Sequence, residues 1–159
     1  MIKINTNAAV NSKMERAGRG ILARSNNGSV VSAWVGAEQN CSDPIVEEAS
    51  AIRRALVKAK LEGWNRIEIQ CDCKVVVDKI MEENNQDARI GTIVEDIMNM
   101  KEDFCTCSFS FREREGNYVS HELAKFALNL VTDIQWKDSV PAWLTSLARR
   151  HMGAVAPIL

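Results

Sequence analysis

Four polar side chains stand where the sequence predicts that four separate elements begin or end, and their types suit metal chemistry. Two are carboxylates, one is an amide and one is an imidazole: Glu48, Asp72, Asn7 and His121. Carboxylate oxygens are the preferred ligands of Mg²⁺, and an imidazole shifts the preference of a site toward Mn²⁺ or Zn²⁺. If the fold brings the four together, they form a candidate ligand or metal site.

The elements that would hold these side chains can be predicted from the period of the apolar residues. Alternation predicts five strands, over residues 3–10, 18–25, 30–36, 67–72 and 105–111. Repeats of three and four residues predict four helices, from residue 45 to near Gly63 and over 73–83, 90–104 and 118–131. The sequence Ser25–Ser29, with Asn26, Asn27 and Gly28, predicts a tight turn between the second and third strands.

This order of elements predicts an α/β fold with one mixed five-stranded sheet. Three antiparallel strands form a meander, and two further strands follow by right-handed crossovers and run parallel to the first. Helices cover both faces of the sheet. Ligands of such sheets bind at the carboxyl ends of the parallel strands, so we expect Asn7 on the outward face of the first strand and Asp72 beside it.

The length and composition are typical of a single soluble globular domain. The chain has 159 residues and a formal net charge of −1, so any contact with nucleic acid must come from a local patch of positive charge. We expect one domain over residues 1–152 and an irregular tail over 153–159. No apolar run approaches a membrane span and the N-terminus lacks a signal-peptide core, so we expect an intracellular protein, cytoplasmic or nuclear, without a membrane partner. The five cysteines are expected to be reduced.

Several separated motifs together resemble the type 1 ribonuclease H family. They are residues 3–9 (KINTNAA), 48–51 (EASA), 69–72 (IQCD), 114–117 (REGN), 121–125 (HELAK) and 141–144 (PAWL). The resemblance runs in consistent order from residue 2 to about 152. It is strongest to the plant branch related to the ribonuclease H domains of non-LTR retroelement reverse transcriptases. It implies a ribonuclease H-like fold and hydrolysis of RNA in RNA/DNA hybrids.

The resemblance also implies which residues form the active site and where this chain departs from the family. Members hold two Mg²⁺ ions with four carboxylates, whose positions fall on Asn7, Glu48, Asp72 and His121. Glu48 and Asp72 are the implied metal ligands, for Mg²⁺ or Mn²⁺. Asn7 brings no charge at the position that contacts both metals, and Ala8 replaces the usual glycine after it. We therefore expect cleavage to be weak or absent.

Each of these residues also has a purely structural interpretation. Glu48 is a favourable acid for the first turn of a helix, Asp72 could cap the following helix, and His121 could lie on an exposed helix face. The cysteine pairs at 71/73 and 105/107 could suggest zinc. Alternation instead predicts that Cys105 and Cys107 point into the core beside Phe109 and Phe111.

Phosphate contacts would come from basic residues near the predicted site. Arg53, Arg54, Lys58 and Lys60 share the helix of Glu48, and Arg112 and Arg114 follow the last strand. The expected partner is an RNA/DNA hybrid or another nucleic acid. The alternative from another class is a non-catalytic protein-interaction module, with the apolar segment 140–147 as an interface. A third hypothesis is a working hydrolase with an altered substrate or metal.

Overall fold

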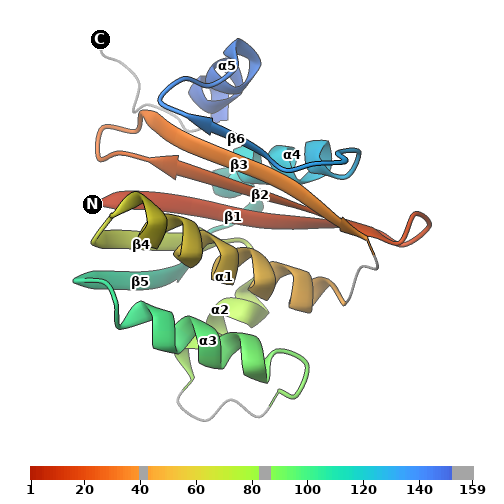
Figure 1. Cartoon of the computed structure of the whole chain (residues 1–159), viewed down its shortest axis with the longest axis vertical. Helices are drawn as coiled ribbons and strands as arrows, with labels where there is room; N and C mark the ends of the chain where they lie inside the picture. The colour runs from red at the N-terminus through yellow and green to blue at the C-terminus, as the bar shows by residue number, and fades with distance from the viewer. Residues whose placement is uncertain (40–42, 83–86, 152–159) are drawn as a thin grey trace.

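The computed structural model describes residues 1–39, 43–82 and 87–151, and these form one mixed sheet with helices on both faces (Figure 1). The strands are β1 Ile2–Asn11, β2 Arg16–Arg24, β3 Val30–Gln39, β4 Arg66–Cys71, β5 Thr106–Phe111 and β6 Ile134–Lys137. The α-helices are α1 Pro44–Glu62, α2 Lys74–Met81, α3 Gly91–Lys101, α4 Tyr118–Ala127 and α5 Ala142–His151, with a short 3-10 helix η1 at Arg114–Asn117.

The strands follow the order β5-β4-β1-β2-β3-β6 across the sheet. This order joins the predicted antiparallel meander to the predicted parallel strands. β2 pairs antiparallel with β1 and β3, whereas β4 runs parallel to β1, with Thr6 opposite Cys71. β5 runs parallel to β4 at one edge. The carboxyl ends of β1 and β4 therefore lie side by side, as the α/β prediction requires.

Two apolar clusters lie on opposite faces of the sheet because neighbouring strand residues alternate in direction. On one face, Ile4, Ile69 and Trp34 pack against apolar residues of α1, α2 and α3. On the other, Leu22 and Val35 pack against α4 and α5. Figure 1 shows α1 in front of the sheet and α4 behind it.

The long helix α1 begins and ends where its sequence predicts. The Asp43 side chain accepts a hydrogen bond from the Ile45 backbone N–H at 2.9 Å, and Pro44 occupies the first helical turn. At the other end, Gly63 adopts a left-handed conformation with φ of 78°, and its N–H bonds to the Ala59 and Lys60 carbonyls. Because these caps fix both ends of α1, they also fix the position of Glu48 along the sheet.

The C-terminal part differs from the prediction. A sixth strand, β6, pairs antiparallel with β3, and α5 follows it, where the sequence predicted only a tail. α4 ends at Ala127 rather than near Val131, which is 96% exposed. β6 was missed because four residues are too few to establish alternation. The expected irregular tail 153–159 lies outside the described residues, and the domain boundary at 152 stays a prediction.

The predicted burial of the last strand was wrong at both of its ends. Cys105 precedes β5 and is exposed, and Phe111 at the strand end is 41% exposed. Phe109 is buried and Cys107 is half-buried, as alternation predicted. The four cysteines among the described residues are all free. In the described part of the chain, no helix combines the length and apolar character needed to cross a membrane.

Candidate functional site

The candidate site lies at the carboxyl ends of β1 and β4. Because Thr6 is the register partner of Cys71, the next residues, Asn7 and Asp72, become neighbours. The Asn7 amide nitrogen donates to an Asp72 carboxylate oxygen, Oδ2, at 3.4 Å. Asn7 is 1% exposed, so the predicted outward-facing position was wrong: helices cover both faces of the sheet here.

Glu48 reaches the same place from α1 and is buried with two hydrogen-bond donors. Its Oε1 accepts from the Ala8 backbone N–H at 3.0 Å, and its Oε2 lies 3.6 Å from the Cys71 thiol. Burial raises the pKa of Glu48 to about 8, although the Ala8 hydrogen bond opposes the shift. This shift favours the protonated form of Glu48 at neutral pH. The residue is not a solvated first-turn acid.

Asp72 is paired with an arginine rather than used as a helix cap. Arg114, from η1, donates from Nε to Asp72 Oδ2 at 2.9 Å. The side chain of Asp72 is only 6% exposed, while that of Arg114 is 65% exposed. The cap position of α2 is held by Cys73, which makes no side-chain cap bond. Two donors thus share one oxygen of Asp72, and one of them is a positive charge.

His121 projects from the first turn of α4 toward this pair. Its Nε2 lies 3.4 Å from Nη1 of Arg114, and its Nδ1 is buried with no hydrogen-bond partner among the described residues. Burial, followed by the charge of Arg114, lowers the pKa of His121. The imidazole is therefore predominantly neutral at pH 7. The structure thus brings together all four residues singled out in the sequence.

The fold and this arrangement can be compared with known proteins. Residues 5–127 match the model of a family described as reverse transcriptase-like. The chain belongs to this family. It is a ribonuclease H-like domain, as the sequence motifs predicted; the plant branch stays a prediction. None of the curated proteins matches this domain.

Solved structures with the same fold are ribonucleases H and a viral reverse transcriptase. Ribonuclease H1 of the archaeon Halobacterium salinarum has a TM-score of 0.74 at 19% identity, over 80% of this chain and 97% of that one. LC11-RNase H1 from compost, solved with an RNA/DNA hybrid, gives 0.72 at 18% identity, over 81% and 97%. The foamy virus protease-reverse transcriptase gives 0.64 at 17% identity, over 82% of this chain and 21% of that one.

The residues present fit one divalent cation better than two. Glu48, Cys71 and Asp72 each offer a ligand atom, and these atoms lie within 4.8 Å of one another. Burial raises the pKa of the Cys71 thiol, and sulfur is a soft ligand, so Mg²⁺ would depend on the two carboxylates. Two carboxylates, one of them paired with Arg114, do not balance two dications.

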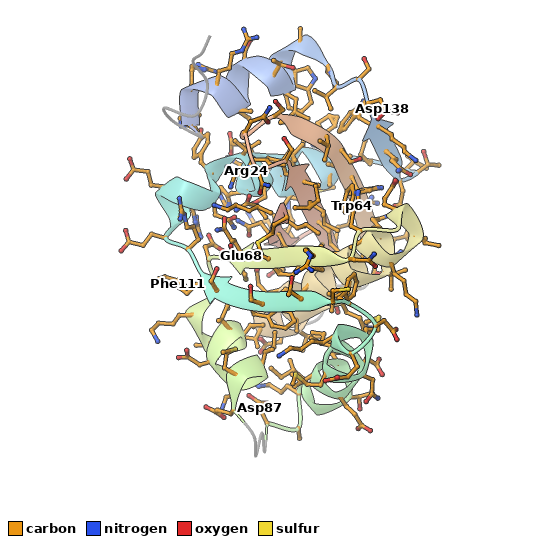
Figure 2. All side chains as sticks on the ribbon, turned by 90° about the vertical axis from the view of Figure 1, so that its left-hand side faces the viewer. Arg24, Trp64, Glu68, Asp87, Phe111 and Asp138 are labelled. Atoms are coloured by element: carbon orange, nitrogen blue, oxygen red, sulfur yellow. The ribbon has the colours of Figure 1, made fainter. Side chains whose placement is uncertain are left out.

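A buried polar network that the sequence analysis did not anticipate ties η1 and α4 to the sheet. Asn117 donates to the Thr6 carbonyl at 2.9 Å, and Asn5 donates to Asn117 at 2.9 Å and to Gln70 at 3.0 Å. Arg24, which is labelled in Figure 2, completes the network by donating to Asn5 at 3.1 Å. The only sign of this network in the sequence was that Asn5 and Asn7 share one face of the predicted first strand. The network fixes where α4 begins, and hence where His121 stands.

The basic residues of α1, which were predicted to contact phosphate, fall into two groups in the structure. Arg53 pairs with Asp96 of α3, and Lys60 pairs with Asp103 in the turn after α3, each at 2.7 Å. Both cations are therefore already compensated, which reduces the charge they offer to phosphate.

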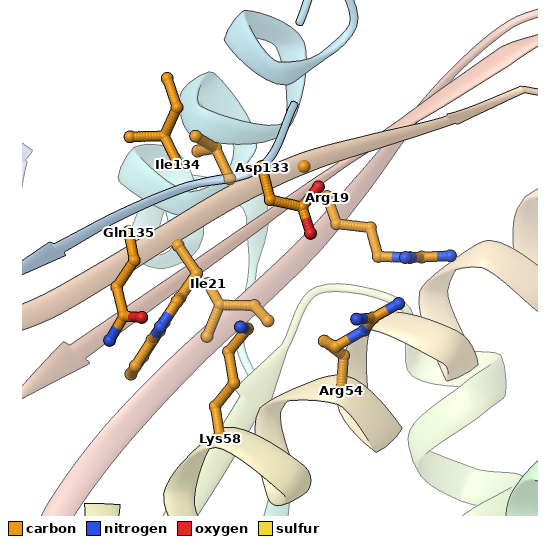
Figure 3. Close-up of a pocket in the computed structure, with 10 residues that line it drawn as sticks. Arg19, Ile21, Arg54, Lys58, Asp133, Ile134 and Gln135 are labelled. Carbon is orange, nitrogen blue, oxygen red and sulfur yellow. The ribbon is translucent and has the colours of Figure 1, made fainter. Parts of the chain in front are cut away.

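The remaining cations of α1 face the other way. Arg54 and Lys58 line a pocket of about 210 Å³ between α1 and the β2–β3–β6 edge, together with Arg19 and Asp133 (Figure 3). The Lys58 ammonium lies 5.4 Å from the centre of the Trp34 ring. Of the four predicted phosphate-binding arginines, Arg114 lies at the site and Arg112 is exposed just before it.

Proposed function

We propose that this ribonuclease H-like domain binds RNA/DNA hybrids at the edge formed by Asn7, Glu48, Asp72 and His121, and hydrolyses them weakly or not at all. Binding is supported by the family and by the fold shared with LC11-RNase H1, which was solved with such a hybrid. A cytoplasmic or nuclear location and descent from a plant retroelement belong to the same proposal.

The observation that carries the weak hydrolysis is the pairing of Asp72 with Arg114. Two-metal hydrolysis needs negatively charged oxygens that attract two cations. Here Asp72 is paired with a guanidinium at 2.9 Å, and burial raises the pKa of Glu48 to about 8, which favours its uncharged form. Asn7 and His121 add no negative charge. A Mg²⁺ ion would have to displace both Arg114 and a proton before it met two free carboxylates.

The same arginine suits a binding role. Because 65% of the Arg114 side chain is exposed, it can turn from Asp72 to a phosphate of a bound strand without unfolding anything. Arg112 is exposed two residues earlier and would add to the attraction. Arg53 and Arg54 stay in the proposal as weaker contacts, because both face carboxylates of the domain itself.

Equilibrium binding tests this proposal. Fluorescence anisotropy would compare a labelled RNA/DNA hybrid with a DNA duplex of the same sequence, in EDTA and over a range of salt concentrations. We expect binding of the hybrid that weakens as salt rises. Absence of hybrid binding at every salt concentration would overturn the proposal.

A protein-interaction module is the second candidate, and one exposed aromatic cluster favours it. The rings of Phe126, Trp136 and Trp143 lie 5.5–6.3 Å apart, and 43% of Trp143 is exposed. Aromatic side chains of this kind are enriched in protein interfaces. Absence of hybrid binding together with Trp143→Ser abolishing co-purification of a partner would support this candidate.

A further inference from the structure

The C-terminal helix α5 lies beyond the residues that match the family and is firmly attached to the domain. The family match ends at residue 127, whereas α5 covers Ala142–His151. Leu144 is 0% exposed and belongs to the apolar cluster that contains Val119, Leu123 and Ala127 of α4. Ala148 of α5 is also buried, at 7% exposed. Trp143 contacts the ring of Phe126 on α4. The backbone at the end of α5 therefore has a fixed position relative to α4.

The last turn of α5 presents two permanent positive charges to solvent. Arg149 and Arg150 are both exposed, and neither makes an ion pair or hydrogen bond with the described residues. This differs from Arg53 and Lys60, whose charges are compensated by Asp96 of α3 and by Asp103 just after it. Cations at the end of a helix also offset its dipole, but that effect acts on stability and not on ligand binding.

A ring contact places this basic end beside the candidate site. His151 stacks on Tyr118, with ring centres 4.0 Å apart and an angle of 30° between the rings. Tyr118 is the first residue of α4 and lies one helical turn before His121 on the same side of the helix. The residue before it, Asn117, is hydrogen-bonded to the strand that carries Asn7.

We infer that the last turn of α5 is a phosphate-binding site, in which Arg149 and Arg150 contact the backbone of a nucleic acid bound at the candidate site. This inference rests on the proposed function and adds to it an element outside the family match. The contacts are to phosphates, so they would strengthen binding of any sequence and would depend strongly on salt.

The salt dependence of hybrid binding tests the inference. The variant Arg149→Gln/Arg150→Gln would be compared with wild type and with the control Arg66→Gln/Lys137→Gln. The control removes the same charge from the first residue of β4, at the opposite end of that strand from Asp72, and from a lysine of β6 that is paired with Glu62. Thermal unfolding of all three proteins would show that each is folded.

Each lost phosphate contact reduces the slope of log K against log salt by roughly 0.9. We expect the α5 variant to bind the hybrid more weakly at low salt, with a slope shallower by about 1 to 2, and the control to resemble wild type. An unchanged slope in the α5 variant, or an equal change in the control, overturns this inference while leaving hybrid binding intact. A wild type that does not bind the hybrid overturns the proposed function itself.

Discussion

At the scale of single residues, the candidate site is an internally compensated version of a metal site. Arg114 supplies the positive charge that Asp72 would otherwise seek from a cation, and Asn7 donates to the same oxygen at 3.4 Å. Glu48 is buried, and this burial raises its pKa to about 8. We therefore propose that competition within the domain, rather than a distorted geometry, limits metal binding.

Removal of Arg114 should make the metal bind more tightly. We expect Arg114→Gln to increase the affinity for Mn²⁺ by on the order of tenfold, because a partly buried ion pair at 2.9 Å no longer has to be broken. Arg112→Gln, which removes an equal charge without touching Asp72, should have a much smaller effect. Calorimetric titration with Mn²⁺ measures both; equal affinities in the two variants would refute the competition by Arg114.

The buried carboxyl of Glu48 should make stability depend on pH. Its pKa in the folded protein, about 8, lies above the value of 4.5 in the unfolded chain, so the folded state binds the proton more tightly. This contribution is fully present below pH 4.5 and is lost as the pH rises toward 8.

Urea unfolding of the protein and of Glu48→Gln, in EDTA and at pH values from 5 to 8, measures this contribution. The free energy of unfolding of the wild type should fall relative to the variant, by at most about 1.4 kcal/mol per pH unit. A difference between the two proteins that does not change with pH would show that Glu48 is ionised throughout the range.

At the scale of elements, the position of His121 depends on how closely α4 approaches β2. A Cβ atom added to Gly20 would lie 2.5 Å from the Ser120 carbonyl oxygen and 2.6 Å from the Ala124 nitrogen. Both atoms belong to the helix backbone, which cannot move alone. The glycine therefore permits the contact that holds the first turn of α4 against the sheet.

Gly20→Ala should accordingly destabilise the domain by about 1–3 kcal/mol, because α4 must shift as a unit. Gly91→Ala is the matched control: it begins α3, and a Cβ there meets no atom within 4 Å. That change should be neutral or stabilising by up to about 1 kcal/mol. Chemical denaturation measures the free energy of unfolding of both variants. Equal values for the two would contradict the packing argument.

Many of the strands and helices, and their arrangement in the sheet, could be predicted from the sequence. Alternation and helical spacing located five strands and placed Glu48 and Asp72 at one edge, because both patterns are set by local geometry. The Asp72–Arg114 pair, the Asn5 network and the burial of Asn7 could not be predicted. Each depends on residues that are far apart in the chain and meet only in the folded domain.

At the scale of the whole molecule, β6 and α5 complete the domain beyond the part that matches the family. β6 extends the sheet at β3, and α5 follows it at the top of Figure 1. Leu144 of α5 joins the apolar cluster that packs against α4. The short strand and the unexpected helix were missed because neither has a repeat long enough to recognise. Both are part of the folded unit, so the region after residue 127 contributes to stability.

Leu144→Ala should therefore destabilise the whole domain by about 2–5 kcal/mol, since this side chain is fully buried against α4 and the sheet. Leu61→Ala changes the same residue type where it is 82% exposed and should alter stability by less than about 0.5 kcal/mol. Thermal or urea unfolding compares them. A Leu144→Ala protein as stable as wild type would mean that α5 is not packed on the domain.

The central claim is that this domain keeps the hybrid-binding fold but has lost the charges that hydrolysis requires. Cleavage of a labelled RNA/DNA hybrid in Mg²⁺ and in Mn²⁺ tests it most directly, with wild type beside Asn7→Asp/His121→Asp. We expect a slow or silent wild type and an active double variant, whose activity Asp72→Ala abolishes. Efficient cleavage by the wild type that Asp72→Ala abolishes would contradict the claim and make Asn7 a working part of the site.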